Sequence, residues 1–296
     1  MTWLKRKDIM LAQPLDDKNL ARIFKDASYA LIQPKLDGER AWVRSSFSEH
    51  ELISSTGKEI KSVPHINLAL EDFLRVNGAP LPLDGELYIH YCTFEYISSI
   101  VGRTANLHEA YTDIEYYVFD TKLNEPQGKR TGDLIAMYWK WIREGDKSLH
   151  RLIKLVPTEL CYSTEEVHQK YSDICAKGYE GIIVRHPNAP YKDGRPWTML
   201  KFKPKKEDIY DFVKVEEAFS DAGEPLKRVG AIVCQDGEGR TFSVGTGAGY
   251  THDDLQELFR KWLAGNLLGY KVRVQYQNLT ETGGVPRFGK FIEVIP

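Results

Sequence analysis

Apolar and polar residues alternate in short runs along the first two hundred positions, with a few longer stretches of helical spacing between them. The short runs predict strands at 29–34, 40–44, 50–55, 81–89, 114–120, 151–156, 180–185 and 198–203. Helical spacing predicts helices at 64–76, 131–145 and 164–177. Strands and helices interleaved in this way indicate one mixed α/β domain.

The charged segment KPKKED (203–208) interrupts the apolar pattern and contains Pro204, so we interpret it as a linker or hinge. Beyond it, the pattern predicts five short strands: YDFVKVEE, VGAIVCQD, RTFSVGT, GYKVRVQY and FGKFIEVI. One predicted helix, HDDLQELFRKWLAG, separates the third strand from the fourth. Five strands with a helix in that position match a small Greek-key barrel of the OB type. We therefore predict two domains, residues 1–206 and 207–296.

The composition is typical of a soluble globular protein. The chain has 296 residues, of which 42% are hydrophobic and 28% charged. No apolar run approaches the ~18–20 residues that span a bilayer, and the N-terminus lacks the apolar core of a secretory signal. The four cysteines (Cys92, Cys161, Cys175 and Cys234) show no CxxC spacing, which disfavours both a zinc site and a disulfide framework. We therefore expect an intracellular, cytoplasmic protein with no membrane partner.

The formal net charge of −2 gives no overall reason to expect nucleic acid as a partner. Any site for a polyanion must therefore come from charges that are grouped along the chain. Two such groups are KFKPKK, with Lys201, Lys203, Lys205 and Lys206, and PLKRVG, with Lys227 and Arg228.

The first motif with possible chemistry is PKLDGER (34–40). In extended chain, Lys35 and Asp37 share one side while Leu36 can enter the core. Gly38 allows a backbone or a ligand to approach closely. A lysine held on a rigid strand and turn can act as a nucleophile. The alternative is a solvated turn with a surface lysine.

The second motif is LDGELY (83–88). Leu83 and Leu87 face one side of the predicted strand, and Asp84 and Glu86 face the other. Carboxylates so placed accept hydrogen bonds from a ribose or hold a divalent cation. An exposed strand face is the alternative.

The third motif is YEGIIVR (179–185), in which Glu180 precedes a strongly apolar strand. A glutamate at the mouth of a strand beside a helix terminus is well placed for a metal or sugar contact. Arg185 falls on the opposite face, so the two residues need not serve one site. A salt bridge is the alternative function of Arg185.

The fourth motif is MLKFKPKK (199–206). Lys201 and Lys203 share one strand face, and Leu200 and Phe202 share the other. Two ammonium groups ~6.5–7 Å apart along a strand suit successive phosphates. The alternative is a basic edge strand whose lysines prevent aggregation.

Each motif is weak alone, but their order is specific. KLDGER, LDGELY, YYVFD, EGIIVR and LKFKPK, followed by an OB-like barrel, resemble the covalent nucleotidyltransferase superfamily, specifically the minimal ATP-dependent DNA ligases of viruses and bacteria. The resemblance covers nearly the whole chain. It implies an α+β fold, with a nucleotidyltransferase (ATP-grasp-like adenylation) domain followed by a C-terminal OB-fold β-barrel.

The resemblance also implies roles for individual residues. Lys35 is similar to the lysine that becomes adenylylated, and Arg40 to the arginine that meets the nucleotide and the nick termini. Glu86 resembles the ribose-binding glutamate and is a further candidate metal ligand. Phe119 resembles the aromatic residue that stacks on adenine.

The remaining matches concern metal and phosphate. Glu180 resembles the metal-associated glutamate of the family. Lys201 and Lys203 match its two phosphate-contacting lysines. Arg195, in YKDGRPW, lies where such enzymes place a further phosphate-binding arginine, although this match is looser.

The chemistry implied by the resemblance is nick sealing in three phosphoryl-transfer steps. ATP and Mg²⁺ are the implied cofactors, and nicked double-stranded DNA is the implied partner of a monomeric enzyme. Phosphoryl transfer rests on positioning and charge neutralisation, which suits a site of lysines, arginines and carboxylates. The candidate DNA contacts are Lys205, Lys206, Lys227, Arg228 and Arg287.

The chain departs from the family pattern in three places. Ser55 stands where the family usually has an arginine. PRFGKFIEVIP resembles the C-terminal motif through Arg287, Phe288 and Lys290, but a further basic residue is expected where the sequence stops. The segment AFSDAGEPLKRVG is short, whereas some minimal ligases carry a long DNA-embracing insertion there.

Related enzymes and a non-catalytic binder are the alternatives to a DNA ligase. An RNA ligase or an mRNA capping guanylyltransferase would share the motifs, although VGTGAGY followed by a helix looks more like the DNA ligase type. A non-catalytic nucleic-acid binder is disfavoured because it would have no need of Lys35. A NAD⁺-dependent ligase is disfavoured because the chain has neither a four-cysteine zinc module nor an extra N-terminal nicotinamide-binding region.

Overall fold

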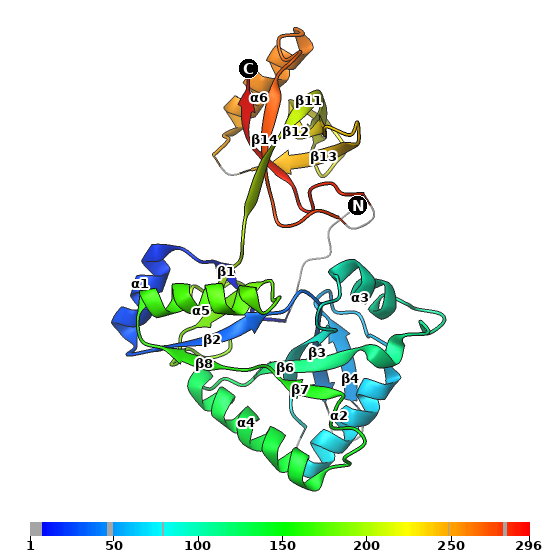
Figure 1. The fold of residues 1–296 in the computed structure, drawn as a ribbon, viewed down its shortest axis with the longest axis vertical. Coiled ribbons are helices and arrows are strands. Elements are labelled where there is room, and N and C mark those ends of the chain that lie inside the picture. The colour runs from blue at the N-terminus through cyan, green and yellow to red at the C-terminus, as the bar shows by residue number, and fades with distance from the viewer. Residues whose placement is uncertain (1–7, 46–49, 79, 248, 281–282) are drawn as a thin grey trace. The chain divides into compact units, whose positions relative to one another are not determined.

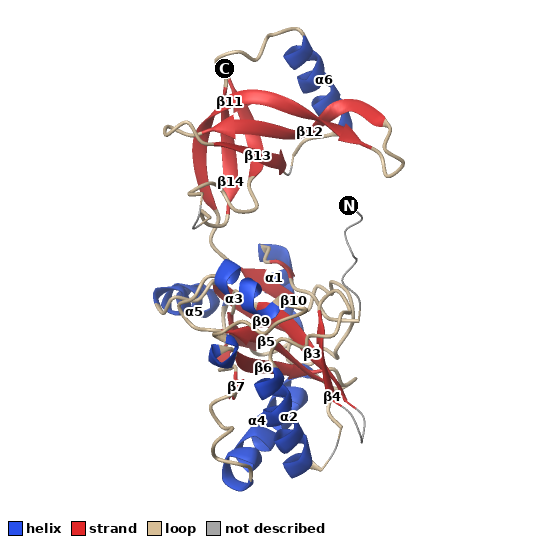
Figure 2. Cartoon of the chain, turned by 90° about the vertical axis from the view of Figure 1, so that its right-hand side faces the viewer, coloured by secondary structure: helices blue, strands red, loops and turns tan. Residues whose placement is uncertain are grey.

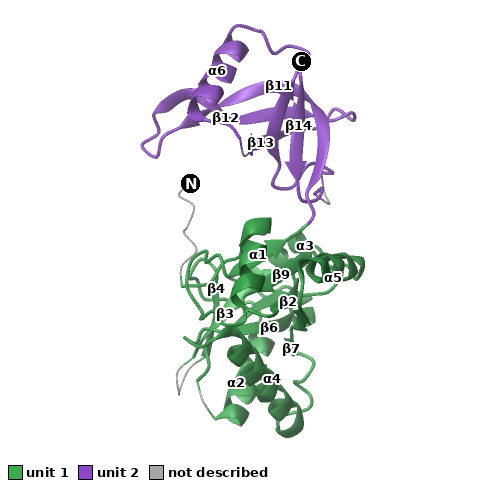
Figure 3. Ribbon diagram, turned by 90° about the vertical axis from the view of Figure 1, so that its left-hand side faces the viewer, with its two compact units in different colours: residues 1–203 green, residues 204–296 purple. Residues whose placement is uncertain are grey.

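The computed structural model describes residues 8–45, 50–78, 80–247, 249–280 and 283–296. The chain divides into two compact units, residues 1–203 and 204–296 (Figure 3). The division follows Lys203, whereas the predicted domain boundary follows Lys206. No helix among the described residues is long and apolar enough to cross a membrane.

The first unit contains two five-stranded sheets (Figures 1 and 2). One sheet has the order β1 (Gln13–Pro14), β10 (Met199–Phe202), β9 (Gly181–Arg185), β2 (Ala30–Lys35) and β8 (Glu159–Cys161). The other has the order β4 (His50–Ser54), β3 (Glu39–Ser45), β5 (Leu83–Tyr88), β6 (Glu115–Thr121) and β7 (Ile153–Leu155). The short turn from β2 to β3 joins the two sheets, and it contains the first motif.

Helices cover both sheets with apolar side chains. Helices α1 (Asp17–Asp26) and α5 (Thr164–Ala176) share a core with β2, β9 and β10. The larger core joins β3 to β7 with α2 (Pro64–Asn77), α3 (Phe94–Val101) and α4 (Gln127–Glu144). A short 3₁₀ turn, η1 (Tyr111–Asp113), precedes β6.

The ends of α2 follow from its sequence. Pro64 occupies its first turn, where the missing N–H costs nothing. Gly78 ends the helix in the left-handed region with φ of 71°, and its N–H donates to the Leu74 carbonyl. This confirms the helix predicted at 64–76.

Two helices of the first unit were not predicted from the pattern. Helix α1 has ten mostly polar residues and buries only Leu20 and Ile23, so few apolar positions mark its amphipathic face in the sequence. Helix α3 has eight residues, and its buried side chains include β-branched Ile97, Ile100 and Val101, which favour strands. Thr93 caps α3 by accepting a hydrogen bond from the Tyr96 N–H, a local signal that the apolar pattern does not contain.

The second unit is a closed five-stranded barrel with one helix, as predicted. Its strands are β11 (Lys206–Phe219), β12 (Pro225–Gln235), β13 (Thr241–Thr246), β14 (Lys271–Tyr276) and β15 (Lys290–Ile295), in the order β11-β12-β13-β15-β14. Helix α6 (His252–Leu263) lies between β13 and β14 in the chain. A reciprocal capping box of Thr251 and Asp254 fixes its start.

The predicted linker at 203–208 is too long. Strand β11 begins at Lys206 and pairs with β14, with Lys206 opposite Tyr276. The first residues of β11 are exposed, so they carry no apolar alternation that could reveal a strand. The segment AFSDAGEPLKRVG is also mostly strand, because β11 and β12 extend into it and only residues 220–224 form the turn.

Candidate active site

Strand pairing brings the first and third motifs together. Strands β2 and β9 are antiparallel, with Lys35 opposite Gly181, and the Glu180 N–H donates to the Lys35 carbonyl at 3.2 Å. The Lys35 ammonium forms an ion pair with Glu180 Oε2. An added Cβ at Gly181 would lie 2.2 Å from the Phe202 carbonyl oxygen, so only glycine allows β10 to approach this closely.

The fourth motif completes a cluster around Glu180. Lys203 Nζ lies 3.0 Å from Glu180 Oε1, so two ammonium groups share one carboxylate. Burial alone would raise the pKa of Glu180. The charges of Lys35 and Lys203 and their hydrogen bonds outweigh burial and lower that pKa below its usual range.

Lys201 belongs to the same group of charges. Burial, together with the positive charges of Lys203, Lys35 and Arg195, lowers the pKa of Lys201 to about 8. Lys201 has no carboxylate partner among the described residues. The cluster therefore holds more cationic groups than its carboxylates neutralise, which suits a polyanionic ligand such as a triphosphate.

Glu86 lies at the edge of this cluster. Its pKa is raised to about 8 by burial, with Glu180 and Asp84 adding to the shift and Lys35 and Arg40 opposing it. The raised pKa favours the protonated carboxyl group of Glu86, which can donate a hydrogen bond. An added Cβ at Gly38 would lie 3.0 Å from Glu86 Cγ and 2.3 Å from the Leu87 carbonyl oxygen, so the turn needs glycine there.

Arg40 is held by Asp84, the other carboxylate of the second motif. Arg40 lies opposite Glu86 in the pairing of β3 with β5, and its Nε donates to Asp84 Oδ1 at 2.7 Å. Its Nη2 donates to Asp84 Oδ2 at 2.5 Å. The Asp84 side chain is fully buried, so it is available neither to a ribose nor to a cation. Asp84 is instead the counter-ion of Arg40.

Phe119 lies beside two guanidinium groups. The centroid of its ring is 4.8 Å from Arg40 Cζ and 5.5 Å from Arg185 Cζ. The Phe119 carbonyl accepts a hydrogen bond of 3.0 Å from Gln33 Nε2, which fixes β6 against β2. The half-buried ring remains partly accessible in the same unit as Lys35, as a base-stacking residue requires.

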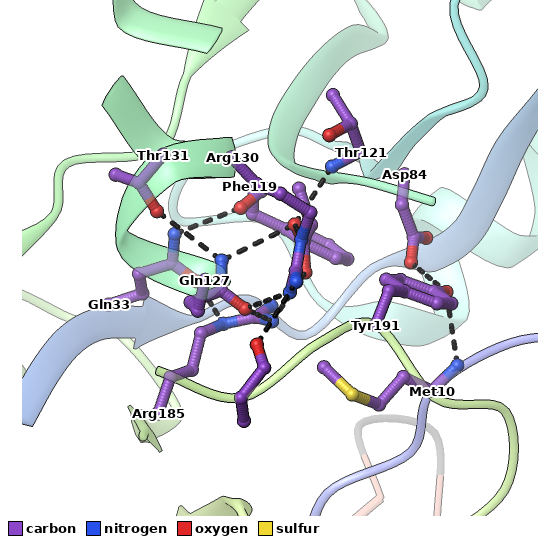
Figure 4. A network of polar contacts seen from close by, with 12 residues as sticks. Met10, Gln33, Asp84, Phe119, Thr121, Gln127, Arg130, Thr131, Arg185 and Tyr191 are labelled. Atoms are coloured by element: carbon purple, nitrogen blue, oxygen red, sulfur yellow. Dashed lines mark hydrogen bonds and ion pairs between the residues drawn. The ribbon is translucent and has the colours of Figure 1, made fainter. Parts of the chain in front are cut away.

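The structure confirms the alternative prediction for Arg185, that it forms a salt bridge. Its Nη1 donates to Asp120 Oδ2 at 2.7 Å, and its Nε donates to Gln33 Oε1 at 2.7 Å. Arg130 Nε also donates to Asp120, at 2.8 Å. Gln127 accepts from both guanidinium groups, and Figure 4 shows Gln33, Gln127, Arg130 and Arg185 converging.

Arg195 is anchored by the N-terminal segment. Its Nη1 donates to the Ala12 carbonyl at 3.1 Å, and its own carbonyl accepts from Gln13 Nε2. Its charge contributes to the lowered pKa of Lys201, so it acts on the same group of charges. Ser55 lies in the turn after β4, which therefore lacks the family's guanidinium group.

The five candidate DNA contacts all belong to the second unit: Lys205, Lys206, Lys227, Arg228 and Arg287. The Lys227 backbone has a positive φ of 49°, and its N–H donates to Glu217 Oε1 at 2.8 Å. Arg287 Cζ lies 4.9 Å from the ring centroid of Phe288, which is exposed. The cluster around Glu180 belongs to the first unit.

The sequence motifs did not reveal the buried partners of the site. Asp120 ends the motif YYVFD and Asp84 begins DGELY, but nothing local indicates which arginine each one meets. Tyr191 lies in YKDGRPW four residues before Arg195, and its hydroxyl donates to Asp84 Oδ2 at 2.6 Å. For Asp120, which follows the apolar run YYVF, a polar residue at the end of an apolar strand was the available signal.

Among the described residues, no group of three or more His, Cys, Asp or Glu side chains could hold a metal ion. Mg²⁺, however, is usually held by one or two carboxylates together with substrate phosphates. Glu180 and Glu86 provide carboxyl groups of this kind beside the cationic cluster, and Glu86 would have to ionise. The residues therefore fit a cation that arrives with a phosphate ligand.

Two family profiles match the chain. Residues 9–203 match the profile described as ATP dependent DNA ligase domain, and residues 222–294 match the one described as DNA ligase OB-like domain. The first match covers more than half of the chain and includes every candidate residue around Lys35.

Individual relatives are named DNA ligase. The DNA ligase of African swine fever virus is 27% identical over 278 residues, which cover 89% of this chain and 62% of the viral protein. The DNA ligase of Haemophilus influenzae is 24% identical over 261 residues, covering 88% of this chain and 85% of the bacterial protein. This chain thus spans less than two thirds of the length of the viral relative.

A solved structure from a structure-function analysis of Lig E DNA ligases shares the fold. It superposes with a TM-score of 0.72 at 21% identity, over 97% of this chain and 98% of that chain. The similarity thus extends through both the α/β unit and the barrel.

Proposed function

Because the chain belongs to the family of ATP-dependent DNA ligase domains, we propose that it is an ATP-dependent DNA ligase that seals nicks in duplex DNA through a lysyl-AMP intermediate. One observation carries this proposal. The Lys35 ammonium at the end of β2 is held by Glu180, which also pairs with Lys203, and the neighbouring Lys201 has no carboxylate partner among the described residues. A nucleophile beside such a cluster suits attack on a phosphorus atom whose leaving group is anionic.

In the first step, the Lys35 ammonium gives one proton to its ion-pair partner Glu180, and the resulting neutral amine attacks the α-phosphate of ATP. A phosphorus–nitrogen bond forms, the bond to pyrophosphate breaks, and the attacking nitrogen loses a second proton to solvent. The cationic side chains of Lys201, Lys203 and Arg195 neutralise charge on the phosphate oxygens as pyrophosphate departs.

In the second step, an oxygen of the 5′-phosphate at the nick attacks the same phosphorus and releases Lys35. In the third, the 3′-hydroxyl attacks the 5′-phosphate, forms the phosphodiester and releases AMP. Arg40 is the group we assign to the nick ends and the nucleotide phosphate. Because Asp84 offsets the cost of burying it and raises its pKa, Arg40 stays charged throughout.

The nucleotide and its cation have separate contacts in this proposal. Phe119 stacks on the adenine, and Glu86 bonds the ribose. Mg²⁺, held by Glu180 and Glu86 with the phosphates, would supply further charge neutralisation. Glu180 would then exchange part of its contact with Lys35 and Lys203 for the cation.

We assign the DNA contacts to exposed and half-buried cations of the barrel unit and consider the enzyme a monomer. The residues are Lys205, Lys206, Lys227, Arg228 and Arg287. Contacts of this kind bind phosphates of either strand without reading sequence, and they release counterions on binding.

The decisive experiment measures the intact mass of the protein after incubation with ATP and Mg²⁺. We expect the wild type and Lys129→Ala to gain the mass of AMP, and Lys35→Ala to gain nothing. Lys129 is a matched control because it is an exposed lysine paired with Asp133 on α4. An adduct that persists in Lys35→Ala would refute the assignment of the nucleophile.

Nucleotide and end specificity are tested in the same preparation. The wild type should form the adduct with labelled ATP and seal a nicked DNA duplex. Adduct formation with GTP only, or sealing of RNA ends in preference to DNA ends, would identify a capping guanylyltransferase or an RNA ligase instead.

A further inference from the structure

We propose that Tyr191 is a positioning residue for Arg40, acting through the buried carboxylate of Asp84. This inference rests on the proposed function, because Arg40 is the group assigned there to the nick ends. Tyr191 has no role in any motif considered above. It lies in the loop between β9 and β10, the loop that also contains Arg195.

The Tyr191 hydroxyl makes two hydrogen bonds that close a ring of contacts. It donates to Asp84 Oδ2 at 2.6 Å and accepts from the Met10 N–H at 3.0 Å (Figure 4). Arg40 Nη2 donates to the same Asp84 oxygen at 2.5 Å and to the Met10 carbonyl at 3.0 Å. Tyr191 therefore contacts both residues that supply acceptors to Arg40 Nη2: it bonds the Asp84 carboxylate directly and bonds Met10 through its N–H.

The donors of Arg40 are divided between protein and solvent. A guanidinium group has five N–H donors, and Asp84 and Met10 account for those on Nε and Nη2. Nη1 has no hydrogen-bond acceptor among the described residues. The ring of contacts thus leaves the Nη1 group of Arg40 for the substrate. It also fixes the orientation of the guanidinium plane, as the positioning of a catalytic cation requires.

The loop that carries Tyr191 is itself held in place. The Leu11 N–H donates to the Gly194 carbonyl at 2.7 Å, and the Gly194 N–H donates to the Ile9 carbonyl at 3.0 Å. Ile9 and Met10 are buried, whereas Gly194 is exposed, so the pairing ties the outer loop to a buried segment. The segment from Ile9 to Leu11 therefore connects the Tyr191 loop to the Arg40 guanidinium.

The hydroxyl, more than the ring, performs this function. Burial and the neighbouring Asp84 charge raise the pKa of Tyr191, so the hydroxyl remains a donor over the neutral range. Tyr191→Phe keeps the ring beneath Arg130, whose Cζ lies 5.7 Å from its centroid. The substitution removes only the donor to Asp84 and the acceptor for Met10.

A double-mutant cycle with Arg40→Lys tests this coupling. Arg40→Lys keeps a positive charge beside buried Asp84 but lacks the planar fork of donors that Tyr191 helps to align. The assay is single-turnover sealing of a nick that already carries the 5′-adenylate. Tyr191→Phe should slow it about tenfold in the wild-type background, because a hydrogen bond to a charged group is lost. In the Arg40→Lys background, Tyr191→Phe should slow sealing by less than about twofold.

The control is Tyr276→Phe, which removes a hydroxyl that donates to the Asp208 carboxylate in the barrel unit. We expect it to seal at the wild-type rate. Tyr191→Phe at the wild-type rate, or slowing by the same factor in both backgrounds, would overturn the inference while leaving the proposed function intact. A wild type that seals no nick would overturn the proposed function and this inference together.

Discussion

The charged clusters at the two ends of β9 differ in how exposed their cationic side chains are. At its start, Glu180 meets Lys35 and Lys203, whose side chains are 22% and 28% exposed. At its end, Arg185 and Arg130 share Asp120 with 2% and 0% of their side chains exposed. One cluster is open to a ligand and the other is sealed.

Net charge does not distinguish the two clusters, because each has more cationic groups than carboxylates. What differs is how far the donors of the cations are paired within the protein. The sealed cluster gives Arg130 the carbonyls of Glu125 and Ala189, and Gln127 accepts from both of its guanidinium groups. The open cluster gives Lys201 no carboxylate among the described residues. The half-buried Lys201 ammonium therefore keeps donors without a carboxylate partner, which is what the proposed phosphate site requires.

The strongest test of this comparison is Asp120→Asn in the sealed cluster. Removing the charge leaves two buried guanidinium groups without a counter-ion, which should lower the free energy of unfolding by about 3–5 kcal/mol. Urea unfolding measures the effect. Asp133→Asn, which breaks an exposed pair with Lys129, should change the free energy of unfolding by less than about 0.5 kcal/mol. A loss below about 1 kcal/mol at Asp120 would mean that the sealed cluster is not held by its carboxylate.

The corresponding change in the open cluster should affect catalysis and leave stability nearly unchanged. Lys201→Ala and Lys203→Ala each remove a charge-assisted phosphate contact, about 1.5–3 kcal/mol, or about 10- to 150-fold in rate. The rate of lysyl-AMP formation at fixed ATP measures the loss, with urea unfolding and Lys129→Ala as controls. If either variant reacts at the wild-type rate, that lysine makes no contact with the phosphate in this step.

The smallest expected effect is a pH dependence carried by Lys201. Its pKa of about 8 means that the ammonium form, which binds phosphate, is lost as the pH rises through that value. The KM for ATP in adduct formation should therefore rise above about pH 8, by at most about tenfold per pH unit for one proton.

Lys201→Arg sharpens this test because arginine stays protonated over the same range. Its KM for ATP should be less dependent on pH than that of the wild type. Parallel pH profiles for the two proteins would show that another group causes the dependence.

The sequence anticipated the elements and the motifs well. The strands ending at Lys35 and beginning beside Glu180, and the five-stranded barrel with its helix, were all visible in the apolar pattern. The salt-bridge alternative for Arg185 was also confirmed. Helix α1 was missed because it buries only Leu20 and Ile23, and the start of β11 because both of its faces are exposed.

What the sequence by itself determined is local: strand periodicity, the glycine turn after Lys35, and the order of motifs that identifies the family. What only the tertiary structure decided is pairing. Arg40 meets Asp84 44 positions away, and Arg185 meets Gln33 across 152 positions. Periodicity tells which face a side chain occupies, but the register of two sheets and the path of a loop select the carboxylate that each cation meets. A buried charge is stable only with that particular partner, so the division between sealed and open clusters exists only in the folded chain.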